Sequence, residues 1–437
     1  MKRHVIAVVG GAVAGSEAAA LCAARGALVV VFEQGPRPYG KIEGGLPRWH
    51  AKLREKEFRR IDANLSHPNV RFVPCTKIGE DLSFEELRGL GFGAVILANG
   101  AWRDRPLPID GIDRFVGKGL VYQNPFVYWF NHGHEPGYEG PVYETPEGAV
   151  VIGGGLASID VAKILSLSTH ARAIRAAGRN VELDELEQGG IGRWCAAHGV
   201  DLDTLGVDPP TLYYRRRMED MPLASPPPDA TEEQLEKTRQ VRVKVMRRVM
   251  ERYRVRLQTL RSPIEAIAEG ERLVGMRFQV TEVVDGRVRP VEGETEEVYA
   301  PLFVSSIGSI PEPLPGIPMK GELYDFANWE TGEIRGLPGV FGLGNVLTGQ
   351  GNIRDSRLNA QEIARGVLEG FLTPEEVDAS LDQAHAAMRA RAEPVVAAAL
   401  ATPEVDDTAI DAYVHRRWEQ VGYPGDYAVW IAAQADR

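Results

Sequence analysis

The chain has 437 residues, of which 44% are hydrophobic and 25% are charged, so it is long enough for two or three globular domains. Its formal net charge of -11 argues against nucleic acid as a partner, because an acidic surface repels phosphate. The cysteines, Cys22, Cys75 and Cys195, form no C-x-x-C pair and fall short of the Cys₄ set of most iron–sulfur clusters. We expect no bound metal and a reducing, cytoplasmic location.

The N-terminal segment does not predict a secretory signal, although the basic residues 2–4 precede an apolar run. Glu17 interrupts that run, which matches the strand and turn of a nucleotide-binding unit. No apolar stretch reaches the ~20 residues that a membrane helix needs. We therefore expect no membrane span.

In chain order, the first part of the sequence predicts a β-α-β unit. Val5–Val9 is a β-branched strand, and a glycine-rich turn, a helix to about Arg25 and a strand at 27–32 follow it. Further predicted elements are a helix at 52–64, strands at 70–74 and 94–98, and a linker rich in Gly, Pro, Glu and His at 131–148.

A second β-α-β unit begins about 140 residues later, with a strand at 149–152 and a helix at about 157–167. A helix-rich segment to about Asp208 precedes the next strand, Thr211–Tyr214. The remaining predicted elements are a proline loop at 226–228, a basic helix at 232–253, a β-rich meander at 254–299, a buried strand at 302–307, a glycine-rich loop at 342–353, a helix at 355–371 and a helical C-terminal tail.

The first glycine-rich turn is G-G-A-V-A-G at residues 10–15. Its glycines permit a tight turn, and the N–H groups at the following helix start bind a pyrophosphate. Glu33 ends the next strand about 20 residues on, where an acid binds a ribose hydroxyl. Ala12 replaces a glycine of the usual pattern and narrows the approach of the phosphate. The pattern predicts a dinucleotide site; the alternative is a tight turn in an unrelated α/β fold. The expected ligands are Gly10, Ala12, Ala14, Gly15 and Glu33.

The second glycine-rich turn is G-G-G-L-A-S at residues 153–158. The strand that follows its helix ends in Arg215, Arg216 and Arg217 rather than in an acid. Arginine at that place suits a 2′-phosphate, so we expect NADP(H) in preference to NAD(H), the alternative being a solvated basic cluster. The residues expected to bind NADP(H) are Gly153, Gly155, Leu156, Ala157, Ser158, Arg215 and Arg216. Two dinucleotide sites without a dithiol indicate direct hydride transfer from a nicotinamide to a flavin.

Several segments between residue 5 and about residue 372 resemble those of the adrenodoxin reductase-like ferredoxin–NADP reductases and of the glutamate synthase small subunit. Asn99 and Asn345 replace a threonine and an aspartate of the family pattern, and the cysteine-rich N-terminal region of the glutamate synthase subunit is missing. The matching segments are 97–101, 126–131, 153–165, 214–216 with 221–222, 306–308 with Pro311, and 342–345.

The resemblance implies an α/β fold with two Rossmann-type domains. A discontinuous FAD domain would comprise residues 1–122 and 300–375, and an inserted NAD(P) domain residues 123–299, with a helical insertion at about 168–210. Residues 376–437 would form a helical C-terminal extension. His50 is the catalytic candidate, with a surface histidine as the alternative. Besides the first turn, the implied FAD-binding residues are Gly40, Gly45, Leu46, Ala98, Asn99, Gly100, Gly344, Asn345, Asn352 and Ile353.

The implied activity is hydride transfer between NAD(P)H and FAD, coupled to single-electron exchange with a ferredoxin or another iron–sulfur or flavin protein. A basic stretch, here called the arginine face, is a candidate docking surface for such an acidic partner; the alternative is a solvated helix face. It comprises Arg239, Arg242, Lys244, Arg247, Arg248, Arg252, Arg254 and Arg256.

Two other functions stay open. One is an electron-input subunit of a larger complex, attached through residues 168–210 or through the C-terminal tail. The other is a non-catalytic, flavin-binding regulatory protein. The tail contains aromatic residues of the kind that anchor interfaces, namely Tyr413, Trp418, Tyr423, Tyr427 and Trp430.

Overall fold

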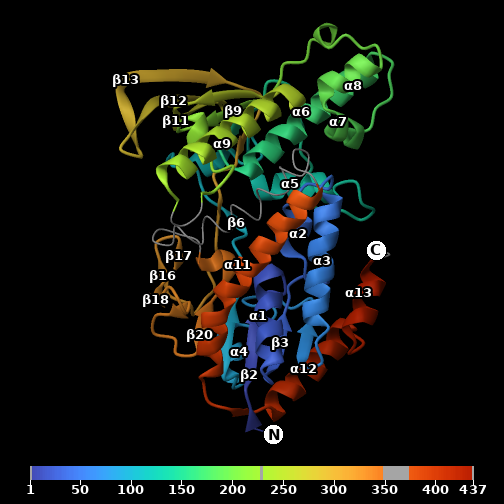
Figure 1. The fold of residues 1–437 in the computed structure, drawn as a ribbon, viewed down its shortest axis with the longest axis vertical. Coiled ribbons are helices and arrows are strands. Elements are labelled where there is room, and N and C mark those ends of the chain that lie inside the picture. Colours follow the sequence, from blue (N-terminus) through green and yellow to red (C-terminus); the bar gives the residue numbers. More distant parts are fainter. Residues whose placement is uncertain (1, 227–229, 348–373, 436–437) are drawn as a thin grey trace.

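Two largely parallel sheets organise the chain, one in the lower and one in the upper part of Figure 1. The computed structural model describes residues 2–226, 230–347 and 374–435. Asn352, Ile353, the predicted helix at 355–371 and the last part of the predicted loop at 342–353 lie outside the described residues.

The first sheet has the order β18-β19-β20-β5-β2-β3-β4 in the described part of the chain. Its central strands read V-I-A-V-V and L-V-V-V-F and are buried throughout, as expected for parallel strands covered on both faces. Helix α1 (Val13–Ala24) packs against α3 (Ala51–Leu65) and α11 (Pro374–Leu400). The strands are β2 (Val5–Val9), β3 (Leu28–Phe32), β4 (Val70–Val73), β5 (Ala94–Leu97), β18 (Phe326–Asn328), β19 (Glu333–Ile334) and β20 (Val340–Gly342).

The second sheet has the order β10-β9-β8-β14-β7, and its strands are parallel. The predicted strands at 149–152, 211–214 and 302–307 all belong to it. Its strands are β7 (Leu120–Tyr122), β8 (Val150–Ile152), β9 (Thr211–Tyr214), β10 (Arg256–Thr259) and β14 (Phe303–Ser305). The helices beside it are α5 (Gln123–His132), α6 (Leu156–Ala176), α7 (Leu183–Gly189), α8 (Ile191–Ala197) and α9 (Glu232–Tyr253).

Strands β7 and β14 belong to the second sheet, although their residues fall within the ranges predicted for the FAD domain. That domain was expected to span 1–122 and 300–375, whereas the structure pairs β14 with β7 and with β8 in the second sheet. Both strands are short apolar runs whose sequences contain no information about their partners. The chain therefore crosses between the sheets along 98–119 and again after Ser305.

The segments around these sheets differ from expectation in extent. Helix α6 continues to Ala176, so the inserted segment begins later than residue 168, and its helices α7 and α8 pack against α6 and α9. The β-rich segment predicted at 254–299 contributes to two sheets. Strand β10 joins the parallel second sheet, and the remaining strands form an antiparallel sheet at the upper left of Figure 1. These strands are β11 (Arg261–Glu269), β12 (Arg272–Val284) and β13 (Arg287–Tyr299). Short elements complete the fold: β1 (Lys2–Arg3), β6 (Arg103–Asp104), β15 (Ser309–Ile310), β16 (Met319–Lys320), β17 (Leu323–Tyr324), β21 (Val405–Asp406), α2 (Gly40–Gly44), α4 (Phe84–Gly89), η1 (Ile112–Phe115), η2 (Asp203–Leu205), η3 (Met218–Asp220) and η4 (Gly344–Leu347).

The C-terminal helices α12 (Thr408–Val421) and α13 (Tyr427–Ala435) cover the edge of the first sheet beside β4. The indole of Trp418 donates to the carbonyl of Phe72 at 2.7 Å, and that of Trp430 donates to the carbonyl of Pro36 at 2.7 Å. Tyr413, Tyr423 and Tyr427 pack into the same apolar clusters. The aromatic residues suggested as partner anchors are therefore engaged within the chain, where they protect an edge strand.

No helix in the described ranges combines the length and the apolar character that crossing a membrane would require.

Candidate functional site

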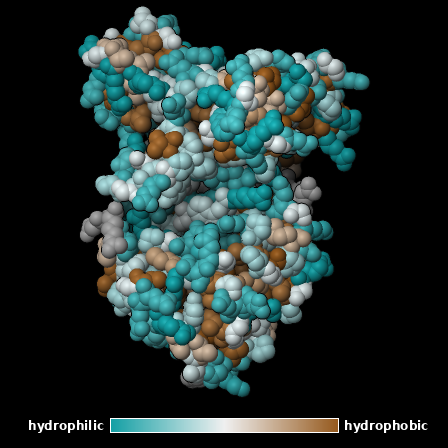
Figure 2. Space-filling view, turned by 180° about the vertical axis from the view of Figure 1, so that it is seen from behind, coloured by the Kyte–Doolittle hydropathy of each residue, from teal (hydrophilic) through white to brown (hydrophobic). Residues whose placement is uncertain are grey.

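A cavity of about 1010 Å³ lies between the two sheets, and both glycine-rich turns line it. Figure 2 shows the recess between the upper and lower parts of the molecule from behind. A volume of this size accommodates large organic ligands. Both turns thus open into one space, although about 140 residues separate them in the sequence.

The first turn requires its glycines for steric reasons. Gly10 has φ +95°, and a Cβ there would lie 2.6 Å from the carbonyl oxygen of Ala98. A Cβ on Gly15 would lie 1.8 Å from the carbonyl oxygen of Gly10. Ala12 is accommodated because it faces another glycine: a Cβ on Gly40 would lie 2.9 Å from the Cβ of Ala12. The turn thus presents the N-terminus of α1 to the cavity in spite of the alanine.

Glu33 lies at the end of β3 on the cavity wall and is 6% exposed. Its carboxylate accepts hydrogen bonds from the backbone N–H of Gly11 at 2.8 Å and of Gly35 at 3.0 Å. Burial raises the pKa of this carboxyl group, and the hydrogen bonds from Gly11 and Gly35 oppose that shift. Each carboxylate oxygen retains a lone pair, so Glu33 can accept a ribose hydroxyl while it fixes the turn.

In the second turn, two glycines serve packing and the third faces open space. A Cβ on Gly153 would lie 2.2 Å from the carbonyl oxygen of Ser306, and one on Gly154 would lie 2.1 Å from the ring of Tyr214. A Cβ on Gly155 would meet no described atom within 4 Å. Ser158 on α6 donates from its hydroxyl to the carbonyl of Gly155 at 2.6 Å. Gly155 thus leaves a space at the start of α6 that suits a phosphate.

Arg215 and Arg216 line the cavity beyond the end of β9. The antiparallel sheet holds this segment, because Arg216 donates to the carbonyl of Gly286 at 2.8 Å and Thr281 donates to the carbonyl of Arg215 at 2.9 Å. Arg217 instead bonds to Asp220 at 2.9 Å. The structure therefore separates two cavity-lining arginines from a third that caps a local turn, a distinction that the R-R-R sequence does not contain.

The other predicted flavin residues in the described part of the chain also meet at this cavity. Its lining includes Gly40, Gly45, Leu46, Ala98, Asn99, Gly100, Gly344 and Asn345. The side-chain amide of Asn99, which replaces the family threonine, donates to the hydroxyl of Tyr324 at 3.2 Å.

His50 is buried, with 3% exposure, so it is not a surface histidine. Its Nε2 accepts a hydrogen bond from the indole of Trp49 at 3.0 Å and lies 3.4 Å from Oδ1 of Asp160. The tautomer that accepts from Trp49 cannot donate to Asp160 from the same nitrogen. The described lining of the cavity includes Asp160 but not His50, so His50 stands one residue behind the wall.

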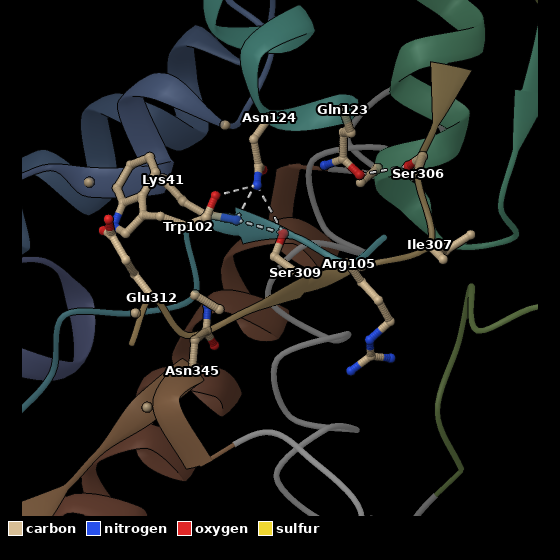
Figure 3. A pocket seen from close by; sticks show the side chains of 18 of the residues that line it. Lys41, Trp102, Arg105, Gln123, Asn124, Ser306, Ile307, Ser309, Glu312 and Asn345 are labelled. Carbon is tan, nitrogen blue, oxygen red and sulfur yellow. Dashed lines mark hydrogen bonds between the residues drawn. The ribbon is translucent and has the colours of Figure 1, made fainter. Parts of the chain in front are cut away.

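Sequence reasoning missed a polar cluster in the cavity wall (Figure 3). Lys41 donates to Oδ1 of Asn124 and to Oγ of Ser309, each at 3.0 Å, and lies over the ring of Trp102. Separately, Ser306 donates to the side-chain oxygen of Gln123 at 2.6 Å. The cluster draws on α2, α5, β15 and a crossing segment, and no single stretch of sequence carries a signal for it.

Comparison with known proteins gives the same picture as the motifs. No family model matches the chain. NADPH:adrenodoxin oxidoreductase, mitochondrial, of Arabidopsis thaliana is 36% identical over 149 residues, which cover 33% of this chain and 29% of that protein. NADPH-ferredoxin reductase FprA of Mycobacterium leprae is 28% identical over 399 residues, 84% of each chain. The chain resembles the adrenodoxin reductase-like ferredoxin–NADP reductases. The predicted resemblance is thereby confirmed, although the match spans less than a third of the Arabidopsis relative.

The fold is also similar to solved structures. FprA from Mycobacterium tuberculosis, in its His57Gln mutant, superposes with a TM-score of 0.58 at 24% identity and covers 90% of both chains. The same FprA in complex with NADPH gives a TM-score of 0.57 at 23% identity, over 88% of this chain and 90% of that one. The chain thus has the expected α/β fold, and this fold resembles that of FprA.

Proposed function

We propose that the chain is an FAD-dependent oxidoreductase that exchanges hydride with NAD(P)H and single electrons with a ferredoxin-like protein. The observation that supports this most is the shared cavity, into which both glycine-rich turns and both sets of predicted ligands open. The relatives named above are NADPH-dependent reductases of adrenodoxin or ferredoxin. A single cavity of this kind brings two redox cofactors into contact without a dithiol relay.

The residues divide between two cofactors. FAD, when bound, accepts a hydride and releases single electrons. The start of α1 would hold its pyrophosphate, and Glu33 would hold its ribose. The start of α6 at Gly155 would hold the pyrophosphate of NADP(H), with Arg215 and Arg216 at the 2′-phosphate. His50 would lie behind the wall, 3.4 Å from Asp160, which itself faces the cavity.

Anaerobic reduction of the purified protein tests the proposal directly. We expect a yellow protein whose flavin absorbance bleaches rapidly with NADPH and more slowly with NADH. A colourless protein that cannot be loaded with FAD would refute the proposal. A yellow protein that neither nucleotide reduces would favour the flavin-binding regulatory alternative. Size-exclusion of native extract separates a free reductase from an electron-input subunit.

Arg216→Ala is expected to weaken NADPH binding about tenfold and to leave NADH binding unchanged, because a charge-assisted hydrogen bond contributes roughly 1.5–3 kcal/mol. Dissociation constants from absorbance titrations of the oxidised protein measure this. Arg217→Ala is the matched control, since Arg217 bonds to Asp220. Equal weakening of both nucleotides by Arg216→Ala would contradict a 2′-phosphate contact.

Several members of the arginine face make ion pairs or hydrogen bonds within the chain. Arg239 pairs with Glu232 and Glu236, and Arg256 pairs with Asp208. The guanidinium groups of Arg242 and Arg252 donate to backbone carbonyls. The exposed members besides Arg256 are Lys244, Arg247, Arg248 and Arg254. These side chains are the best candidates to contact an acidic protein.

The double variant Arg247→Glu with Arg248→Glu is expected to raise the KM for a ferredoxin at least fivefold at low salt and to spare ferricyanide turnover. Reversing two exposed charges opposes the approach of an acidic partner but leaves the cavity intact. Steady-state assays with both acceptors measure the effect. Arg59→Glu on α3 is the control, since that side chain is exposed away from α9. Equal losses with both acceptors would argue against a docking role.

A further inference from the structure

Lys41 occupies an unusual position for a lysine, in the wall of the cavity where the two sheets meet (Figure 3). It is the second residue of α2, and its amine reaches Oδ1 of Asn124 and Oγ of Ser309, each at 3.0 Å. Asn124 belongs to α5 and Ser309 to β15, so both partners come from elements that flank the second sheet. The amine also lies 5.6 Å from the centre of the Trp102 ring, within cation–π range.

The partners of Lys41 are oriented as acceptors. The side-chain amide nitrogen of Asn124 donates to the carbonyl of Trp102 at 2.8 Å, which fixes its Oδ1 toward Lys41. Ser309 Oγ lies 3.1 Å from the same amide nitrogen and accepts from it. The cluster therefore presents oxygen lone pairs to the amine, as an ammonium group requires. Among the described residues, two N–H bonds of the ammonium have partners, and one further N–H bond is available to a ligand.

The charges around Lys41 leave its own charge largely uncompensated. Asp104 on β6 acts on it at longer range, and its carboxylate accepts from the backbone N–H of Asn124 at 3.2 Å. Burial lowers the pKa of the Lys41 amine to about 8, which Asp104 opposes, and burial raises the pKa of Asp104 to about 6. Glu43 on α2 is paired with Arg37, and two acidic residues of the cavity lining are also paired, Glu312 with Lys77 and Glu322 with Arg105.

The place of Lys41 points to one end of the dinucleotide at the first turn. A Cβ on Gly40 would lie 2.9 Å from the Cβ of Ala12 in that turn, so Lys41 lies beside the predicted pyrophosphate site. Glu33 marks the predicted ribose end. Asn124 follows β7 and Ser309 follows β14, and the ends of these strands lie beside the end of β8, where the second turn begins. A redox ring that extends from the first turn toward the second would meet Lys41.

We propose that the ammonium of Lys41 contacts the flavin ring and stabilises its reduced form, an inference that rests on the proposed function. Two electrons and one proton pass as hydride from the nicotinamide to the flavin, so the nucleotide is oxidised and the reduced flavin gains negative charge. Lys41 forms no covalent bond. A fixed cation in a site of low dielectric favours the more negative state of its neighbour. Lys41 is therefore a determinant of the reduction potential.

The experiment is an anaerobic dye-equilibrium titration of the FAD-loaded protein at pH 7. Lys41→Met is expected to lower the preference for reduced over oxidised FAD at least tenfold, which is about 30 mV for a two-electron couple. Lys41→Arg retains the charge and should stay near the wild-type potential. Lys118→Met is the matched control, because Lys118 is exposed and pairs with Glu271 outside the cavity. An unchanged potential in a yellow Lys41→Met protein would overturn the inference and leave the proposed function standing.

The wild-type protein provides a second test that needs no variant. At pH values well below its pKa of about 8, Lys41 is already protonated, so reduction takes up no extra proton at this site. Above pH 8 the oxidised protein has lost that proton, and reduction, which raises the pKa of the amine, takes one from solvent. The reduction potential should therefore fall more steeply with pH above about 8. The extra slope corresponds to a further tenfold change per pH unit in the equilibrium between reduced and oxidised FAD, and Lys41→Met should abolish it. A constant wild-type slope from pH 6 to 10 would refute the inference, whether or not Lys41→Met folds. A wild-type protein without FAD would refute the proposed function itself.

Discussion

Gly155→Val is expected to weaken NADPH binding at least a hundredfold while the fold and the bound FAD stay intact. A Cβ at Gly155 meets no described atom within 4 Å, so the protein tolerates the side chain. The valine fills the space at the start of α6 and blocks the phosphate from the backbone N–H groups there. Loss of two charge-assisted hydrogen bonds, at roughly 1.5–3 kcal/mol each, gives this factor or more.

Absorbance titration with NADPH and thermal unfolding measure the two halves of this expectation. Gly89→Val is the matched control, because a Cβ at Gly89 also meets no described atom within 4 Å, yet this residue ends α4 away from the cavity. Wild-type affinity for NADPH in Gly155→Val would show that the second turn holds no phosphate. A large loss of FAD in the same variant would show that the two sites are not separate.

Gly15→Val is expected to abolish FAD binding and to lower the free energy of unfolding by about 3 kcal/mol. A Cβ at this position would lie 1.8 Å from the carbonyl oxygen of Gly10, so the turn must open and the start of α1 must move. The expected product is colourless, and its flavin content after heat release measures the loss. NADPH binding at the second turn should survive, which distinguishes a local effect from global unfolding.

Gly89→Ala serves as the control for the cost of losing a glycine in this fold. Full FAD occupancy in Gly15→Val would mean that the flavin is bound elsewhere. That result would remove the basis of the FAD assignment, since Gly10, Gly15 and Glu33 define one geometric unit.

The sequence predicted local structure well where local interactions decide it. The run L-V-V-V-F becomes the fully buried strand β3, and Glu232–Tyr253 becomes helix α9 with the capping box of Thr231 at its start. The helix predicted at about 157–167 ends too early, since α6 continues through Ser166, Thr169 and His170 to Ala176. In the structure these polar residues are buried and satisfied by backbone carbonyls, so the helix continues.

The candidate site likewise contains residues that local sequence predicted and residues whose place depends on the tertiary structure. Both turns, Glu33 and Arg216 follow from spacing along a β-α-β unit, because the strand, turn and helix of such a unit are contiguous in sequence. His50 was placed near the flavin by resemblance, and the structure puts it behind Asp160 on α6, 110 residues away. The sequence also could not predict which members of the arginine face bind acidic side chains or backbone carbonyls within the chain. A run of arginines does not distinguish a side chain that docks a partner from one that stabilises the fold.

The sequence alone determined that two glycine-lined helix starts follow buried strands, since steric limits on φ and on close approach admit little but glycine at positions 10, 15, 153 and 154. Only the tertiary structure decided that both starts face one cavity, that β7 and β14 join the second sheet, and that Lys41 meets Asn124 and Ser309. The physical reason is range. A turn is fixed by neighbours within a few residues, whereas the pairing of β7 with β14 and the contacts of Lys41 with Asn124 and Ser309 join segments that the sequence separates by 83 residues or more.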